Sequence, residues 1–309
     1  MSSFYGLPKI HKPNAPGHSL PPFRGIISSM KGPTTRASYW LDSILNPLVP
    51  QYCGEHWCKD TLHLLREIEK LNENNVFLEH ALITIDVVDM YNSIPHIDGI
   101  TSCRDALRCL TSFTVPQIDR ILELIMFVLT NNCFQFKGEF YRQVRGTAMG
   151  SPFAPAYANL FMAYLWNNAV ALQLPRPVWL KRYLDDIICL IFTPVEVEDI
   201  LELLNSVHPT TKFTISEVSS SQSFLDVLVN IIQGKLHTDL FSKPTDAHRF
   251  IPPTSCHPRH IFRSIVYSGA LRIRRICSRD DFFCKPHQGV PWLSDEKRLQ
   301  RILRRPYHR

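Results

Sequence analysis

Tyr183-Leu184-Asp185-Asp186 lies between two apolar runs, Val178-Trp179-Leu180 and Ile187 to Phe192. Apolar runs on both sides of a short polar step predict a β-hairpin, here with two adjacent carboxylates at its tip. Ionised carboxylates repel one another, so this pair indicates a bound cation. Mg²⁺ is the natural candidate, because it binds carboxylate oxygens and keeps positions for water and phosphate. The alternative is an ordinary acidic turn, since aspartate favours turns without any ligand.

A third carboxylate, Asp86, follows the apolar run Ala81 to Ile85. A run of this kind predicts a buried strand that delivers its acid at the C-terminal end. Two strands can then present three carboxylates to one place, and this set suits two-metal phosphoryl transfer, in which the ions lie about 4 Å apart. The sequence therefore predicts that Asp86, Asp185 and Asp186 meet at a site for two Mg²⁺ ions, which could also take Mn²⁺.

Several motifs resemble those of reverse transcriptases and follow the same order along the chain. Three stretches resemble the first three palm motifs of that family: Asp86-x-x-x-x-Tyr91, Gly146-Thr147-Ala148-Met149-Gly150-Ser151-Pro152 and Tyr183-Leu184-Asp185-Asp186. Residues 4–13, 224–227 and 241–245 resemble the first finger motif and two later motifs of the Penelope-like retroelement branch, which is related to telomerase reverse transcriptase. The resemblance runs from about residue 4 to about residue 280.

This resemblance implies an α+β fold, a right-hand polymerase with a ferredoxin-like palm, partial fingers and the start of a helical thumb. It divides the chain into fingers (1–80), palm (81–245, with a finger insertion around 96–150) and a basic helical thumb (246–309). The implied activity is RNA-directed DNA polymerisation, which adds deoxynucleotides to a DNA primer on an RNA or DNA template. The alternative is a truncated, catalytically idle retroelement remnant that still binds nucleic acid through its basic end.

The resemblance also assigns residues to the metal ions and to the incoming deoxynucleoside triphosphate. Metal ligands are expected at Asp86, Val87, Asp185 and Asp186, and nucleotide contacts at Lys9, Lys12, Arg24, Asp89 and Tyr91. Arg24 suits phosphate oxygens through its planar fork of donors, and a lysine suits them as a mobile point charge. For the two lysines, the alternative is ordinary solvated surface.

The resemblance places Tyr91 beneath the nucleotide sugar. There its ring would clash with a 2′-hydroxyl group, and the site would favour deoxynucleotides over ribonucleotides. The alternative is a core aromatic residue whose hydroxyl reaches the surface.

The glycine-rich motif at 146–152 combines backbone freedom with a helix start, and Pro152 suits the first turn of a helix that runs to about Leu172. Small residues along this helix let a base pair approach, although helix packing alone also selects alanine. The common family form has Gln-Gly before Ser-Pro, whereas Arg145-Gly146 here stands one residue further away, so no residue takes the glutamine's role. Template and primer contacts are expected at Gly146, Gly150, Ser151, Pro152, Tyr183, Phe224 and Leu225, the last two in a strand from Phe224 to Ile232.

The C-terminal part of the chain is strongly basic. From Lys243 onward it carries 15 Lys and Arg against 5 Asp and Glu, whereas the preceding residues carry 19 against 23. Such clustering favours binding of a phosphate backbone, and a solvated basic face is the alternative. Residues 257–279 predict a short helical pair around Ser268-Gly269 that resembles a helix-turn-helix segment. Backbone contacts are expected from Arg259, Arg263, Arg272, Arg274 and Arg275.

Nine cysteines, an odd number scattered through apolar contexts, predict reduced thiols, as in a cytoplasmic or nuclear protein. The cysteines and histidines near the C-terminus match no standard zinc-finger spacing. Apolar runs are far shorter than the roughly 20 residues that a membrane-spanning helix needs, so we expect no membrane partner.

Overall fold

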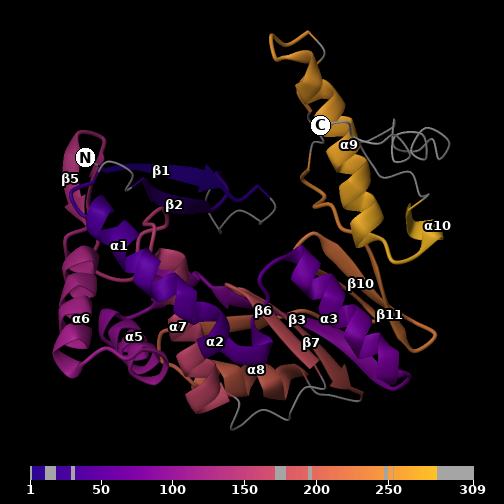
Figure 1. Ribbon diagram of the computed structural model, residues 1–309, viewed down its shortest axis with the longest axis horizontal. Coiled ribbons are helices and arrows are strands. Elements are labelled where there is room, and N and C mark those ends of the chain that lie inside the picture. Colours follow the sequence, from indigo (N-terminus) through magenta and orange to yellow (C-terminus); the bar gives the residue numbers. More distant parts are fainter. Residues whose placement is uncertain are drawn as a thin grey trace. The chain divides into compact units, whose positions relative to one another are not determined.

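The computed structural model describes residues 2–10, 19–28, 32–170, 179–193, 197–246, 250–252 and 254–283. Chain contacts divide it into two compact units, and Figure 1 labels most of their helices and strands. The first unit comprises Met1–Trp57 and Ile83–Glu217, and the second comprises Cys58–Leu82 and Val218–Arg309. The predicted division by role into fingers, palm and thumb stays a prediction.

A four-stranded sheet forms the centre of the first unit. Its strands are β3 (His80–Val88), β6 (Trp179–Tyr183), β7 (Asp186–Phe192) and β8 (Lys212–Ile215), in the order β6-β7-β3-β8. The first and third of these strands in the chain therefore lie side by side in the middle, as in a ferredoxin-like split βαβ sheet. The predicted α+β class is confirmed.

Burial in β3 follows the two-residue period of a strand. Ile83, Ile85 and Val87 are buried in the core, whereas Thr84 and Asp86 between them are half-buried. Successive side chains of a strand point to opposite faces, so one face of β3 packs against helices and the other holds Asp86. The alternation gives the acid a rigid support.

Helices of the first unit pack with the apolar face of this sheet in one hydrophobic core. They are α1 (Thr35–Leu45), α2 (Val49–Cys53), α4 (Met90–Ser93), α5 (His96–Leu110), α6 (Val115–Thr130), α7 (Ala154–Leu165) and α8 (Val197–Ser206), with 3₁₀ turns at Asn46–Leu48 and Gly54–His56. The sequence explains where α6 begins, because Thr114 and Gln117 form a capping box at its N-terminus. In α7 nearly every side chain is buried, since α1, α2 and α5 all contact it.

A second sheet of the first unit has the order β2-β1-β4-β5. Its strands are β1 (Ser2–Pro8), β2 (Phe23–Ser28), β4 (Cys133–Phe136) and β5 (Glu139–Arg142). A hairpin joins β4 to β5, and it turns at Lys137 and Gly138 with φ of 50° and 87°. Two positive φ angles are typical of the tight turn that matches the strand twist.

The second unit is built on three strands and two longer helices. The strands are β9 (Ser221–Phe224), β10 (Val227–Ile232) and β11 (Lys235–Leu240), in the order β11-β10-β9. Both α3 (Thr61–Asn74) and α9 (Arg259–Ile276) contact β11, and the short α10 (Asp280–Phe283) follows. At the start of α3, the Asp60 side chain accepts a hydrogen bond from the His63 N–H, which caps the helix.

The predicted single strand from Phe224 to Ile232 is wrong. The chain turns at Leu225 and Asp226, so that Phe224 pairs with Val227, and Leu225 adopts φ of 57°. Leucine rarely adopts a positive φ. The turn therefore lacks the glycine or asparagine that usually marks such a conformation in a sequence. The aromatic-Leu-Asp order repeats that of Tyr183 to Asp185, where Leu184 also has a positive φ.

The predicted helical pair around Ser268-Gly269 is also wrong, because α9 runs without a break from Arg259 to Ile276. A glycine inside a helix costs only about 1 kcal/mol relative to alanine. The Ser268 hydroxyl donates to the Ser264 carbonyl oxygen of the preceding turn, so its polar group is satisfied within the helix. The helix instead ends at Cys277, before α10.

The glycine-rich motif enters α7 later than predicted. The helix begins at Ala154, and Pro155 rather than Pro152 occupies its first turn. Pro152 lies in the turn before the helix, and the end of α7 continues as a π-helical turn at Trp166–Val170. The predicted end near Leu172 lies outside the described residues. No described helix is both long and apolar enough to cross a membrane.

Gly99 in α5 faces a buried aromatic ring, and its replacement gives a test of this packing. A Cβ atom there would lie 1.9 Å from the hydroxyl oxygen of Tyr157 and 2.2 Å from its ring. We expect Gly99→Ala to lower the free energy of unfolding by about 3 kcal/mol, because both helices are packed into the core. Urea denaturation measures this, and unchanged stability would contradict the packing. Tyr157→Phe should be neutral or mildly stabilising, since its buried hydroxyl has no partner among the described residues.

Candidate active site

Asp86 and Asp185 are held at one place by neighbouring strands. Asp86 lies near the end of β3, and Asp185 lies in the turn between β6 and β7. The Val87 N–H donates to the Asp185 carbonyl oxygen at 3.1 Å. Ordinary bond dimensions then limit the distance between the Asp86 and Asp185 Cα atoms to roughly 8 Å. Both carboxylate side chains are half-buried, so the structure brings together two of the predicted acids.

Asp186 is the third predicted acid and follows Asp185 in the chain, but its environment is different. It is the first residue of β7, pairs with Tyr183 across the hairpin, and is exposed. Among the described residues, no three His, Cys, Asp or Glu side chains lie close enough to form a metal site by themselves. Mg²⁺ commonly takes only one or two protein carboxylates and completes its shell with water and substrate phosphates. Asp86 and Asp185 therefore fit an ion that arrives with a nucleotide.

The turn that carries Asp185 is strained. Leu184 has φ of 52°, a left-handed conformation that bulky residues seldom adopt. Its side chain packs partly buried against the core of the first unit. Such backbone strain persists only where the surroundings hold it, and it concentrates at functional sites.

Tyr91, in α4, lies close to the acids. Its side chain is half-buried, and burial raises its pKa to about 12, with further contributions from Asp185 and Tyr183. Arg24 opposes this rise, so the guanidinium of β2 also acts on the Tyr91 hydroxyl. Asp89 precedes α4 with φ of 49° and accepts a hydrogen bond from the Asn92 side chain. Tyr91 thus lies near Asp185, and its contact with a nucleotide stays a prediction.

Two of the predicted phosphate-binding cations share one face of the β1–β2 hairpin. Arg24 lies opposite Leu7 in the register, and the Lys9 N–H donates to the Pro22 carbonyl oxygen, which extends the ladder. Lys9 is two residues from Leu7, so its side chain lies on the same face as that of Arg24. Arg24 is exposed and Lys9 is half-buried. Lys12 lies outside the described residues.

The backbone of the glycine-rich motif contacts α4 through Gly146 and β2 through Gly150. Gly146 has φ of 71°, and a Cβ atom there would lie 2.5 Å from the Tyr91 carbonyl oxygen. Thr147, the next residue, stabilises this contact, because its N–H donates to the same oxygen at 2.8 Å. Gly150 has φ of 116° and would place a Cβ atom 2.6 Å from the Ile27 carbonyl oxygen. Both glycines are therefore required by close backbone approach, which explains their place in the motif.

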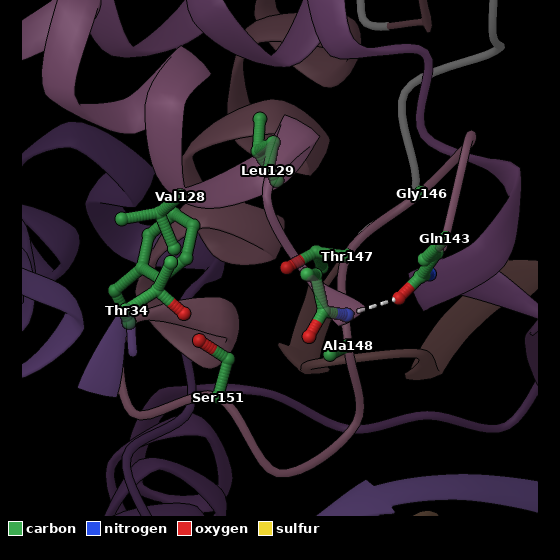
Figure 2. A pocket seen from close by; sticks show the side chains of 10 residues that line it. Thr34, Val128, Leu129, Gln143, Gly146, Thr147, Ala148 and Ser151 are labelled. Atoms are coloured by element: carbon green, nitrogen blue, oxygen red, sulfur yellow. Dashed lines mark hydrogen bonds between the residues drawn. The ribbon is translucent and has the colours of Figure 1, made fainter. Parts of the chain in front are cut away.

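Behind this motif lies a small cavity of about 10 Å³, which both polar and apolar side chains line. Figure 2 shows the side chains of Thr34, Thr147 and Ser151 around it. The Thr147 hydroxyl is buried without a hydrogen-bond partner among the described residues. A space of this size is just enough for one water molecule. Ser151 itself is held by a 2.7 Å hydrogen bond to Ser38 on α1, so the predicted template contact at Ser151 would use its backbone.

The residues of the second unit that were predicted to contact a primer already make contacts within the protein. Phe224 is buried, so only its backbone is available to a primer, and Leu225 beside it is half-buried. The turn is held through Asp226, which accepts hydrogen bonds from Thr61 and from the Arg272 guanidinium. These ties explain how a hairpin with a leucine at positive φ is maintained.

The arginines of α9 fall into two groups. Arg272 and Arg274 form ion pairs, with Asp226 and Asp280 respectively. Arg259 and Arg275 are exposed, and no described acid pairs with either. The side chain of Arg263 lies outside the described part. Backbone binding by these residues stays a prediction, and Arg259 and Arg275, with which no described acid pairs, are best placed for it.

One residue that the sequence motifs did not indicate contacts the acidic turn. Arg182 is almost fully buried and contacts the turn that carries Asp185. Its signal in the sequence is the pair of cations Lys181-Arg182 inside a strand, next to the acidic turn. The Asp226 pair with Arg272 gave no such signal, because the two residues are far apart along the chain and each looked like surface.

The chain matches two family models. Residues 40–221 match the model described as reverse transcriptase (RNA-dependent DNA polymerase). Residues 249–286 match the model described as animal helix-turn-helix domain. None of the curated proteins compared with the chain matches it.

Solved polymerase structures share the fold. Telomerase from Candida albicans, in complex with a fragment of telomeric RNA, is 11% identical, with a TM-score of 0.61 over 98% of this chain and 52% of that one. Apo telomerase from Candida tropicalis, truncated from its C-terminal domain, is 14% identical, with a TM-score of 0.52 over 77% and 55%. The RNA-dependent RNA polymerase of a human picobirnavirus is 11% identical, with a TM-score of 0.62 over 98% and 57%. These likenesses show a right-hand polymerase fold, and the chain spans about half the length of each structure.

Proposed function

This chain belongs to the reverse transcriptase (RNA-dependent DNA polymerase) family, and we propose that it is an RNA-directed DNA polymerase of retroelement origin. It adds deoxynucleotides to the 3′-hydroxyl of a DNA primer by phosphoryl transfer. The observation that carries the proposal is the 3.1 Å hydrogen bond from the Val87 N–H to the Asp185 carbonyl oxygen. This bond fixes the strand of Asp86 against the turn of Asp185, and the two carboxylates stand a hundred residues apart in the chain.

The residues at the site fit divalent cations. Asp86 and Asp185, with the Val87 carbonyl and Asp186 beside them, would hold two Mg²⁺ or Mn²⁺ ions, since hard cations select oxygen ligands. When bound, the ions activate the primer hydroxyl and stabilise charge on the leaving pyrophosphate. Arg24 and Lys9 hold the triphosphate through charge-assisted hydrogen bonds, and the proposed ligands include both template and primer.

A direct test uses the purified chain, a poly-ribonucleotide template and a complementary deoxynucleotide primer. We expect primer extension that requires Mg²⁺ and template and that stops when a dideoxynucleotide is supplied. Absence of extension on RNA and on DNA templates, together with a gel shift of the primer–template duplex, would instead identify an idle remnant that binds nucleic acid. The same assay ranks RNA against DNA templates.

Tyr91 gives a prediction about substrate choice. Replacement by alanine removes the ring that we place beneath the sugar, so ribonucleotides should be admitted. We expect the preference for dCTP over CTP to fall roughly 10- to 100-fold in Tyr91→Ala, measured as the ratio of kcat/KM values. Tyr91→Phe keeps the ring and should keep the preference, whereas equal preference in all three proteins would show that Tyr91 does not face the sugar.

We further propose that the chain derives from the Penelope-like branch and acts in the nucleus or cytoplasm. The finger-like motif near the N-terminus supports the branch, and the helix-turn-helix match at residues 249–286 agrees with a basic nucleic-acid-binding end. Arg259 and Arg275 on α9 are the proposed phosphate contacts, because exposed guanidinium groups suit a nucleic-acid backbone.

A further inference from the structure

Arg182 is a buried cation at the end of β6, immediately before the turn that carries Asp185. Its side chain is only 3% exposed, and no carboxylate contacts it in the described part of the chain. A buried charge without an opposite charge is costly, and an apolar residue would suit the interior of a strand better. A specific role is needed to explain a guanidinium at this position.

The guanidinium joins three parts of the first unit. One terminal nitrogen, Nη1, donates to the Asn159 side-chain oxygen on α7 at 2.9 Å and to the Leu184 carbonyl oxygen at 3.0 Å. The other, Nη2, lies 3.2 Å from the Cys53 sulfur on α2 and 3.3 Å from the Asn159 carbonyl oxygen. The planar, rigid fork of arginine can make these contacts together, whereas the point charge of lysine cannot.

These contacts fix the backbone on one side of Asp185. The Leu184 carbonyl belongs to the peptide plane that precedes Asp185, and Arg182 holds it. The Asp185 carbonyl belongs to the following plane, and the Val87 N–H holds that one. With both flanking planes held, the direction in which the Asp185 side chain leaves the backbone is set. The same bond also restrains the backbone of Leu184, whose φ is 52°.

We propose that Arg182 is a positioning residue that orients the Asp185 carboxylate toward the metal site from inside the core. It does so through the Leu184 carbonyl, with Asn159 and Cys53 keeping the guanidinium in place. The inference rests on the proposed function, since it assigns a supporting residue to the same site. Arg182 is buried, so it has no contact with nucleotide or template.

The test compares wild type, Arg182→Met and Arg182→Lys by two measurements. In primer extension, the Mg²⁺ concentration that gives half-maximal rate should rise about 10-fold or more, because residues that orient metal ligands typically govern affinity on this scale. The rate constant should fall about 100-fold, the usual result of misplacing a group by about 1 Å, while KM for the nucleotide changes little. In a Mn²⁺ titration of the free protein followed by electron paramagnetic resonance, affinity should fall by a similar factor.

Lys181→Met is the matched control. Lys181 is a similarly buried cation on the same strand, and its amino group donates to the Glu55 carbonyl oxygen in the 3₁₀ turn at Gly54–His56. We expect this variant to lose thermal stability without a change in the Mg²⁺ requirement. Arg182→Lys keeps a buried charge and guards against simple unfolding of Arg182→Met, and melting curves report the folded fraction of each protein.

The outcomes separate the two proposals. If wild type extends no primer, the proposed activity fails, and the Mn²⁺ titration still judges Arg182. Loss of activity that only follows the folded fraction, with an unchanged Mg²⁺ requirement, would show a structural role and overturn the inference. Equal Mn²⁺ affinity in wild type and variants, or no binding in any of them, would overturn it as well.

Discussion

Asp185→Asn is expected to reduce primer extension by roughly 1,000-fold or more, with the protein still folded. A carboxylate that holds a catalytic cation stabilises charge in the transition state by several kcal/mol, and about 4 kcal/mol corresponds to this factor. The amide has the same shape as the acid, so the turn between β6 and β7 should keep its conformation. The measurement is the rate of single-nucleotide addition at saturating Mg²⁺, with a melting curve for each protein.

Asp86→Asn should have an effect of similar size. Because the two acids act as a unit, the double variant Asp86→Asn/Asp185→Asn should lose little more than either single variant. Asp119→Asn is the control, since Asp119 is a surface acid paired with Arg104 on another helix of the same unit. Fully additive losses, or near-normal activity in Asp185→Asn, would show that the two carboxylates do not serve one centre.

The acids were predictable from the sequence because each sits where a regular pattern ends. An apolar run of alternating burial delivers Asp86, and a hairpin with two flanking apolar strands delivers Asp185 and Asp186. Periodicity of this kind is read over a few neighbouring residues. The α+β class was predictable for the same reason.

Features that depend on distant residues were not predictable. The guanidinium of Arg182 acts through Asn159 and Cys53, which no local pattern connects with it. The continuity of α9 was missed because a Ser-Gly pair reads as a breaker, although tertiary contacts bury Ala270 next to it and favour helix. The turn at Leu225 was missed because its residues lack turn chemistry, and Asp226 is held from outside the hairpin by Thr61 and Arg272.

Gly146→Ala is expected to lower the free energy of unfolding by about 3 to 5 kcal/mol, the range of the most damaging single substitutions. Two costs combine at this position. A side chain at φ of 71° costs about 1 to 2 kcal/mol by itself. The new Cβ atom would also lie 2.5 Å from the Tyr91 carbonyl oxygen and 2.6 Å from the Asn92 Cα atom, and backbone atoms cannot turn aside as a flexible side chain can.

Gly138→Ala separates these costs. Gly138 has φ of 87° in the β4–β5 turn, and a Cβ atom there would meet nothing within 4 Å. Its replacement should therefore show only the cost of the backbone conformation, about 1 to 2 kcal/mol in urea denaturation. If Gly146→Ala costs no more than Gly138→Ala, the close approach of the glycine-rich motif to α4 does not exist.

The effect of Gly146→Ala on activity follows from the same contact. To relieve the clash, α4 has to move away from the motif, and α4 carries Tyr91, whose hydroxyl is within electrostatic reach of Asp185. A displacement of about 1 Å at such a site can lower the rate about 100-fold. We therefore expect the folded fraction of Gly146→Ala to extend primers about 100-fold more slowly than wild type and to discriminate less between dCTP and CTP. Normal selectivity in the folded fraction would show that the motif supports α4 without positioning Tyr91.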